Sequence, residues 1–146
     1  VETLRRVLVP RATVLTPNLP EAARLLGQPV AESAEAMRAQ GKALVALGAE
    51  AVLMKDGHGA GEVCTDLLVC REGVAEYTAP RIETNNTHGT GCTLSSAIAA
   101  GLAKGLPIGR AVGEAHRYLQ GVIAAADSLD VGGGHGPVHH FHGLWP

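Results

Sequence analysis

The sequence is poor in aromatic residues, has no surplus of positive charge and contains no long apolar run. Aromatic residues make up 3% of the 146 positions, and the formal net charge is -2. Nucleic-acid-binding domains normally carry a basic stripe, so this charge balance argues against nucleic acid as a partner. No apolar stretch approaches the ~20 residues that cross a bilayer, which argues against a membrane helix.

Cysteine is also scarce. The chain has Cys64, Cys70 and Cys92, an odd number without a Cys-x-x-Cys pair. That usage is typical of a reduced protein rather than of a disulfide framework. The 46% hydrophobic content is enough for a real core. With no signal-like segment visible at its start, the sequence predicts one globular, cytoplasmic unit.

Glycine is abundant, and together with proline it divides the chain into short apolar segments. Strand-like and helical segments alternate, which predicts an α/β layered sheet with ligands at the carboxyl ends of its strands. The expected helices are residues 1–10 (ended by Pro10), 20–27, 33–48, 93–104 and 107–126. The expected strands are residues 12–16 and 51–55 and a hairpin of 63–69 and 74–78, followed after the last helix by an irregular tail, 132–146.

The most distinctive segment is Asn-Thr-His-Gly-Thr-Gly-Cys at residues 86–92, directly before a helical pattern. A helix that begins in glycines turns unpaired backbone N–H groups and the positive end of its dipole toward whatever lies above them. Such an end can hold phosphate, and its field favours the thiolate of Cys92, a candidate base. Gly-x-Gly is often only a tight turn, and a lone cysteine is often core, so both interpretations stay open.

Asn18 and Glu21 place an amide and a carboxylate at a corner between a strand and a helix. One interpretation is an ordinary helix cap with an acid in the first turn. The alternative is a carboxylate that orients hydrated magnesium on a nucleotide phosphate. The residues alone favour the cap.

Two further patterns carry less weight. The glycine-rich residues 56–61 follow a strand, as a dinucleotide-binding fingerprint would. That fingerprint requires a helix directly after the glycines, whereas the sequence predicts a strand after residue 61. We therefore expect residues 56–61 to form a mobile loop. The histidines of the tail lack the spacing of a structural zinc site, and we do not expect metal there. They are His135, His139, His140 and His142.

Five collinear segments resemble the hydroxymethylpyrimidine/phosphomethylpyrimidine kinases of thiamine biosynthesis, in the ribokinase-like superfamily. They are residues 15–23, 51–55, 78–82, 86–95 and 134–142. The Gly-Thr-Gly-Cys form is fairly specific, because sugar and pyridoxal kinases of the superfamily usually carry aspartate in place of Cys92. The resemblance implies a three-layer α/β/α fold, ATP and Mg²⁺, and a small-molecule pyrimidine substrate.

By the same resemblance, the backbone amides of one loop would form the anion hole for the transferred phosphate, and Cys92 would be the base that faces the substrate hydroxyl. The loop residues are Gly89, Thr90, Gly91 and Cys92. Phosphoryl transfer depends more on positioning and charge stabilisation than on covalent chemistry, which suits such a loop.

The resemblance also implies roles outside the loop. Asn18 and Glu21 match the family's Asn-x-x-Glu motif for magnesium and phosphate, with Glu21 toward the metal, and Lys55 would lie near the nucleotide phosphates. His116 takes a nucleotide-binding position where the family usually has lysine. Asp56 stands where the family usually has glycine, and Asn85 stands where it usually has a basic residue. The surroundings of the bound phosphate would therefore be less positively charged than in most family members.

Family chains also carry an N-terminal half that is absent here and that would supply most pyrimidine contacts. Residues 1–146 are therefore expected to be the C-terminal, nucleotide-binding half of one kinase domain, with little activity alone. We expect it to form homo-oligomers or to pair with the missing half. The expected activity is ATP-dependent phosphorylation of hydroxymethylpyrimidine and its monophosphate. The alternatives are a pyridoxal/pyridoxine kinase and a non-catalytic nucleotide-binding remnant.

Overall fold

The computed structural model of the chain describes residues 1–56 and 61–145. The chain divides into two compact units, Val1–Pro80 and Arg81–Pro146. Most of the loop expected at residues 56–61 lies outside the described residues. Among the described residues, no helix combines the length and the apolar character that crossing a membrane would require.

The first unit is built on a sheet with the strand order β1-β2-β3-β4. The strands are β1 (Val14–Leu15), β2 (Ala51–Met54), β3 (Val63–Cys70) and β4 (Gly73–Pro80). β1 runs parallel to β2, and β2, β3 and β4 are antiparallel. The predicted hairpin is confirmed, with Cys70 opposite Gly73 at its turn. The first strand is much shorter than the expected residues 12–16.

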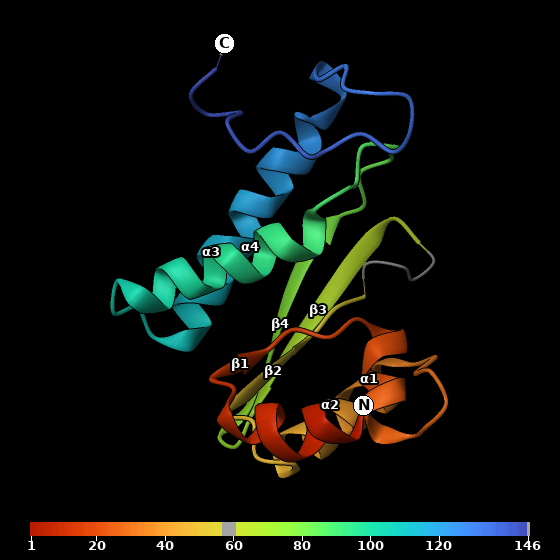
Figure 1. Cartoon of the computed structure of the whole chain (residues 1–146), viewed down its shortest axis with the longest axis vertical. Helices are drawn as coiled ribbons and strands as arrows, with labels where there is room; N and C mark the ends of the chain where they lie inside the picture. Colours follow the sequence, from red (N-terminus) through yellow and green to blue (C-terminus); the bar gives the residue numbers. More distant parts are fainter. Residues whose placement is uncertain (57–60, 146) are drawn as a thin grey trace. The chain divides into compact units, whose positions relative to one another are not determined.

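Two capped helices belong to this unit, α1 (Leu19–Leu26) and α2 (Ala34–Ala46). α1 ends at Gly27, whose φ of 67° is the left-handed conformation that favours glycine. α2 packs on β2 and β3 (Figure 1). Its Gly41 allows the close approach, because an added Cβ would lie 2.7 Å from Cγ2 of Val69. Leu44 of α2 is fully buried in the core beneath it.

The prediction that a single helix ends at Pro10 is wrong. A π-helical turn, η1 (Leu4–Leu8), runs directly into a 3₁₀ turn, η2 (Val9–Arg11). Pro10 stands in the first turn of η2, where a missing N–H costs nothing because no intrahelical partner would receive it. Val9, at 1% exposure, anchors this segment in the core.

The second unit is a pair of helices with an irregular tail. α3 (Thr90–Ala103) packs on α4 (Ile108–Ala124), and η3 (Ala126–Ser128) follows (Figure 1). Gly101 lets the helices approach closely, since an added Cβ would lie 3.0 Å from Cβ of Ala111. The predicted inward face of α4 is confirmed as buried: Ala111, Val112, Ala115, Leu119 and Val122. α3 begins at Thr90, inside the glycine loop rather than at residue 93.

Candidate functional site

Asn18 and Glu21 form a reciprocal cap at the start of α1. The Asn18 side chain accepts the Glu21 N–H at 2.8 Å, and Glu21 Oε2 accepts the Asn18 N–H at 2.8 Å. The ordinary interpretation of this pair as a helix cap is therefore confirmed. The cap uses one carboxylate oxygen. The second, Oε1, accepts no hydrogen bond from the described residues, and the side chain is exposed.

Lys55 lies beside Asn18, where β1 and β2 end. A parallel bridge pairs the two residues, and the Lys55 N–H donates to the Pro17 carbonyl at 3.0 Å. The Lys55 ammonium forms no ion pair with any residue in 1–56 or 61–145. Lys55 and the capping residue Asn18 thus lie together where β1 and β2 end, and the binding of a ligand there stays a prediction.

Asp66 is a residue of this edge that was not among the predicted site residues. It is 7% exposed on β3, and its Oδ1 accepts the N–H of Asp56, the residue after Lys55, at 2.9 Å. A buried carboxylate is retained only where hydrogen bonds compensate its lost hydration. Asp66 therefore fixes the backbone directly after Lys55. Its position within an apolar strand was the available signal.

The glycine loop produces a helix start without a side-chain cap. Gly89 precedes α3 with a φ of 92°, and no described side chain accepts a hydrogen bond at this end. The Thr90 N–H donates to the Thr87 carbonyl at 3.3 Å, and the Thr93 N–H donates to the Gly89 carbonyl at 2.8 Å. The N–H groups of Gly91 and Cys92 lie in the first turn, where the helix offers them no acceptor. They can therefore donate hydrogen bonds to a bound anion.

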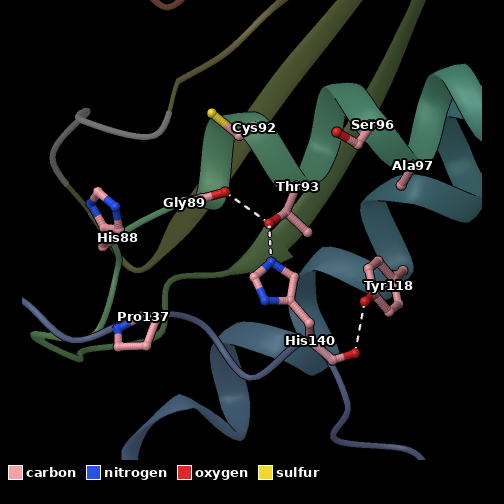
Figure 2. Close-up of a pocket in the computed structure, with 9 residues that line it drawn as sticks. All are labelled: His88, Gly89, Cys92, Thr93, Ser96, Ala97, Tyr118, Pro137 and His140. Atoms are coloured by element: carbon pink, nitrogen blue, oxygen red, sulfur yellow. Dashed lines mark hydrogen bonds between the residues drawn. The ribbon is translucent and has the colours of Figure 1, made fainter. Parts of the chain in front are cut away.

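A pocket of about 610 Å³ opens beside this helix start (Figure 2). It is lined by the loop, one face of α3, a side chain from α4 and the tail. Its lining residues are His88, Gly89, Cys92, Thr93, Ser96, Ala97, Tyr118, Pro137 and His140. Two predicted site residues, Gly89 and Cys92, are thus brought together, whereas Thr93, Tyr118 and His140 were not foreseen.

Cys92 and His116 occupy contrasting environments. Cys92 is exposed in the first turn of α3, and its sulfur points away from Thr93 and His140 (Figure 2). The alternative of a buried core cysteine is therefore wrong. His116 is 8% exposed on the inward face of α4 and is absent from the pocket lining. Its nucleotide-binding role stays a prediction.

The tail is irregular, as predicted, but it is closely attached to the loop. The His88 N–H donates to the Gly136 carbonyl at 3.1 Å, and the Val138 N–H donates to the His88 carbonyl at 3.2 Å. Val138 and His139 are buried. No group of three or more His, Cys, Asp or Glu side chains within the described residues is arranged to hold a metal ion. Two of the tail histidines make polar contacts: His140 Nε2 lies 2.9 Å from Thr93 Oγ1, and His135 Nδ1 lies 3.2 Å from the Asn85 carbonyl oxygen.

The sequence of this chain matches one family model over nearly all of its 146 residues. Residues 1–139 match the family model described as phosphomethylpyrimidine kinase. This chain belongs to the phosphomethylpyrimidine kinase family. A hydroxymethylpyrimidine/phosphomethylpyrimidine kinase from Salmonella typhimurium is 52% identical over 145 residues, which cover 99% of this chain and 54% of that protein. The chain therefore spans about half the length of the curated relatives that it matches.

Solved structures of a pyridoxal kinase and of a phosphomethylpyrimidine kinase both resemble this chain. A pyridoxal kinase from Staphylococcus aureus in complex with AMP-PCP and pyridoxal has a TM-score of 0.90 at 31% identity, covering 95% of this chain and 52% of that one. A phosphomethylpyrimidine kinase from Clostridium difficile has a TM-score of 0.67 at 37% identity, covering 82% and 46% of the two chains. The predicted α/β class with ribokinase-like relatives is confirmed.

Proposed function

We propose that this chain is the C-terminal, nucleotide-binding half of an ATP-dependent kinase that phosphorylates hydroxymethylpyrimidine and its monophosphate in thiamine biosynthesis, in the cytoplasm. The observation that carries the proposal is the uncapped, glycine-led start of α3 beside a pocket that Cys92 lines. A helix end with free amides stabilises the charge of a transferring phosphoryl group. Family membership supplies the substrate class.

In this proposal the α3 loop holds the transferred phosphate. The amides of Gly91 and Cys92 donate to it, and Gly89 supplies the left-handed turn that aims them. Thr90 contributes less, because its N–H already donates to Thr87. The Cys92 sulfur takes the position of the base, where it receives the proton of the substrate hydroxyl.

In the first unit, the sheet edge at Asn18 and Lys55 would bind nucleotide phosphate. Lys55 offers the phosphates an ammonium that forms no ion pair with the described residues, and the Asn18 N–H orients the Glu21 carboxylate through the cap. The second Glu21 oxygen is a hard donor, which fits Mg²⁺ held by one carboxylate and by waters. Magnesium, when bound, neutralises phosphate charge. His116 would contribute from α4 only after a side-chain movement, because it is buried.

A second candidate is a pyridoxal kinase. The observation in its favour is the close structural likeness to a pyridoxal kinase, at a TM-score of 0.90. The loop and Cys92 would serve either substrate, since each presents a hydroxymethyl group on a heteroaromatic ring.

The deciding experiment uses the full-length kinase, meaning a protein that carries both halves of the domain. It measures ATP turnover with hydroxymethylpyrimidine, its monophosphate and pyridoxal, each with and without Mg²⁺. We expect pyrimidine-dependent turnover that requires Mg²⁺. A higher kcat/KM for pyridoxal would establish the second candidate. Absence of turnover with all three substrates, alongside ADP binding, would identify a non-catalytic remnant.

The same assay applied to residues 1–146 alone tests the half-domain proposal. We expect little turnover and either self-association or pairing with the other half, seen by size-exclusion chromatography, because a free sheet edge recruits another strand. A stable monomer with normal turnover would contradict it.

A further inference from the structure

The hydroxyl of Thr93 links the start of α3 to the tail. Thr93 is 6% exposed, and its Oγ1 lies 2.8 Å from the Gly89 carbonyl oxygen and 2.9 Å from His140 Nε2 (Figure 2). The three groups form one chain of hydrogen bonds from the tail to the glycine that opens the helix.

The direction of this chain follows from the number of protons. A threonine hydroxyl has a single proton to donate, and the Thr93 hydroxyl donates it to the Gly89 carbonyl. We assign the remaining contact as a donation from His140 Nε2–H to Thr93 Oγ1, because this tautomer lets all three groups form hydrogen bonds at once. The chain runs from His140 Nε2–H to Thr93 Oγ1–H to the Gly89 carbonyl.

The backbone around His140 is held in place by separate contacts. The Tyr118 hydroxyl donates to the His140 carbonyl at 2.8 Å, and the His139 N–H donates to the Val122 carbonyl at 3.0 Å. Tyr118 and Val122 both belong to α4. The ring of His140, although His140 is an exposed residue, is therefore presented to Thr93 by a fixed backbone.

We propose that His140 is a positioning residue that holds the anion loop, residues 86–92, in its binding geometry through Thr93. The Gly89 carbonyl and the Thr90 N–H share one peptide plane, so fixing that carbonyl fixes the orientation in which the first turn of α3 begins. Gly89 is the left-handed residue and has the greatest freedom to rotate. This role rests on the proposed function of the loop.

The kinetic test uses His140→Leu, which removes the donor, and His140→Gln, whose amide N–H can replace it, in the full-length kinase. We expect His140→Leu to lower kcat about tenfold or more with KM for ATP nearly unchanged, because a displaced loop loses interactions made in the transition state. His140→Gln should recover most of the lost kcat. His135→Leu is the matched control, because His135 lies in the same tail and its ring contacts the Asn85 carbonyl instead of the loop.

A purely structural role predicts a different result. His140→Leu would then lower the melting temperature while kcat stayed within about twofold at a temperature where the protein is folded, and His140→Gln would not differ from it. That outcome would overturn the proposal. Thr93→Val should act through the same chain, so the double variant Thr93→Val/His140→Leu should lose little more than either single variant. Additive losses would also overturn it.

A spectroscopic measurement keeps the test independent of variants that fold poorly. With ¹⁵N-labelled histidine, the His140 ring, assigned by its loss in His140→Gln, should show the proton on Nε2 at neutral pH. A proton on Nδ1 would overturn the assigned direction. If the wild-type protein has no kinase turnover, the proposed function fails and the positioning role of His140 fails with it. If turnover is present and only these outcomes fail, the proposed function stands without His140.

Discussion

The α-carbon of Gly136 packs against the side-chain amide of Asn86. A Cβ added to Gly136 would overlap Asn86 Oδ1 and lie 2.7 Å from its Cγ. Asn86 cannot move aside freely, because its Nδ2 donates to the Ala126 carbonyl at 3.2 Å and to Asp127 Oδ1 at 3.1 Å. The close approach joins the tail to the residue that opens the anion loop.

Gly136→Ala should therefore destabilise the fold by about 1–3 kcal/mol, the usual range for an overpacked site. The measurement is urea unfolding of the variant beside wild type. Gly134→Ala is the matched control, since an added Cβ there meets no atom within 4 Å. Equal free energies of unfolding for the two variants would contradict this prediction, because they would show that the tail can shift away from Asn86 without a loss of stability.

Glu21→Gln should weaken the dependence of turnover on Mg²⁺ while leaving α1 intact. Glutamine can still accept the Asn18 N–H, so the change in stability should stay below about 1 kcal/mol. The measurement is kcat against Mg²⁺ concentration in the full-length kinase. Glu35→Gln is the matched control, because Glu35 is the first-turn acid of the other capped helix, α2. An unchanged Mg²⁺ curve would leave Glu21 as a cap alone.

Cys92→Ala should lower turnover about 10²–10⁴-fold if the thiol acts as the base. Cys92→Asp should recover more activity than Cys92→Ser, because a carboxylate accepts a proton and an alcohol does so poorly. Since Cys92 is exposed, none of the three changes should lower the melting temperature much. Turnover and melting curves of all three variants decide the role, with Cys70→Ala as the control. Near-full turnover of Cys92→Ala would refute the assignment.

Alkaline pH should destabilise the first unit through Tyr77. Burial, and secondly the charge of Cys70, raises the pKa of the Tyr77 phenol above its ordinary value of 10.0. Above about pH 10 the unfolded chain therefore releases a proton that the folded chain keeps, so the free energy of unfolding falls as pH rises, until the folded phenol ionises as well. Urea unfolding followed upward through this pH range should show a steeper decline for wild type than for Tyr77→Phe. Parallel declines would contradict this.

Local signals in the sequence predicted the elements well where one residue type controls the geometry. Asn18 and Glu21 stand three residues apart before an apolar run, and the capping box forms as that spacing predicts. The apolar period of α4 likewise indicated its buried face. Pro10 was misleading, because proline ends a helix only where its N–H would be needed, and a 3₁₀ turn begins there instead.

Long-range contacts account for most of what was missed. Thr93 and His140 meet across 47 positions, and nothing in the spacing of either segment indicates the other. Asp66 had a local signal, a carboxylate in an apolar strand, but its partner, the backbone N–H of Asp56, is set by how the strands pair. The tail histidines showed composition only, and composition does not distinguish a hydrogen-bonding role from a metal site.

Under the proposed function, the start of α3, which has no side-chain cap, would link nucleotide supply to the lifetime of the protein. α1 and α2 carry side-chain caps, whereas α3, which Gly89 precedes, has none. A phosphate bound there would act as the cap, and a ligand that binds only the folded state raises stability with its concentration. We therefore expect nucleotide to act as a structural component of the second unit. Starvation for nucleotide would shorten the survival of this protein as well as slow its chemistry.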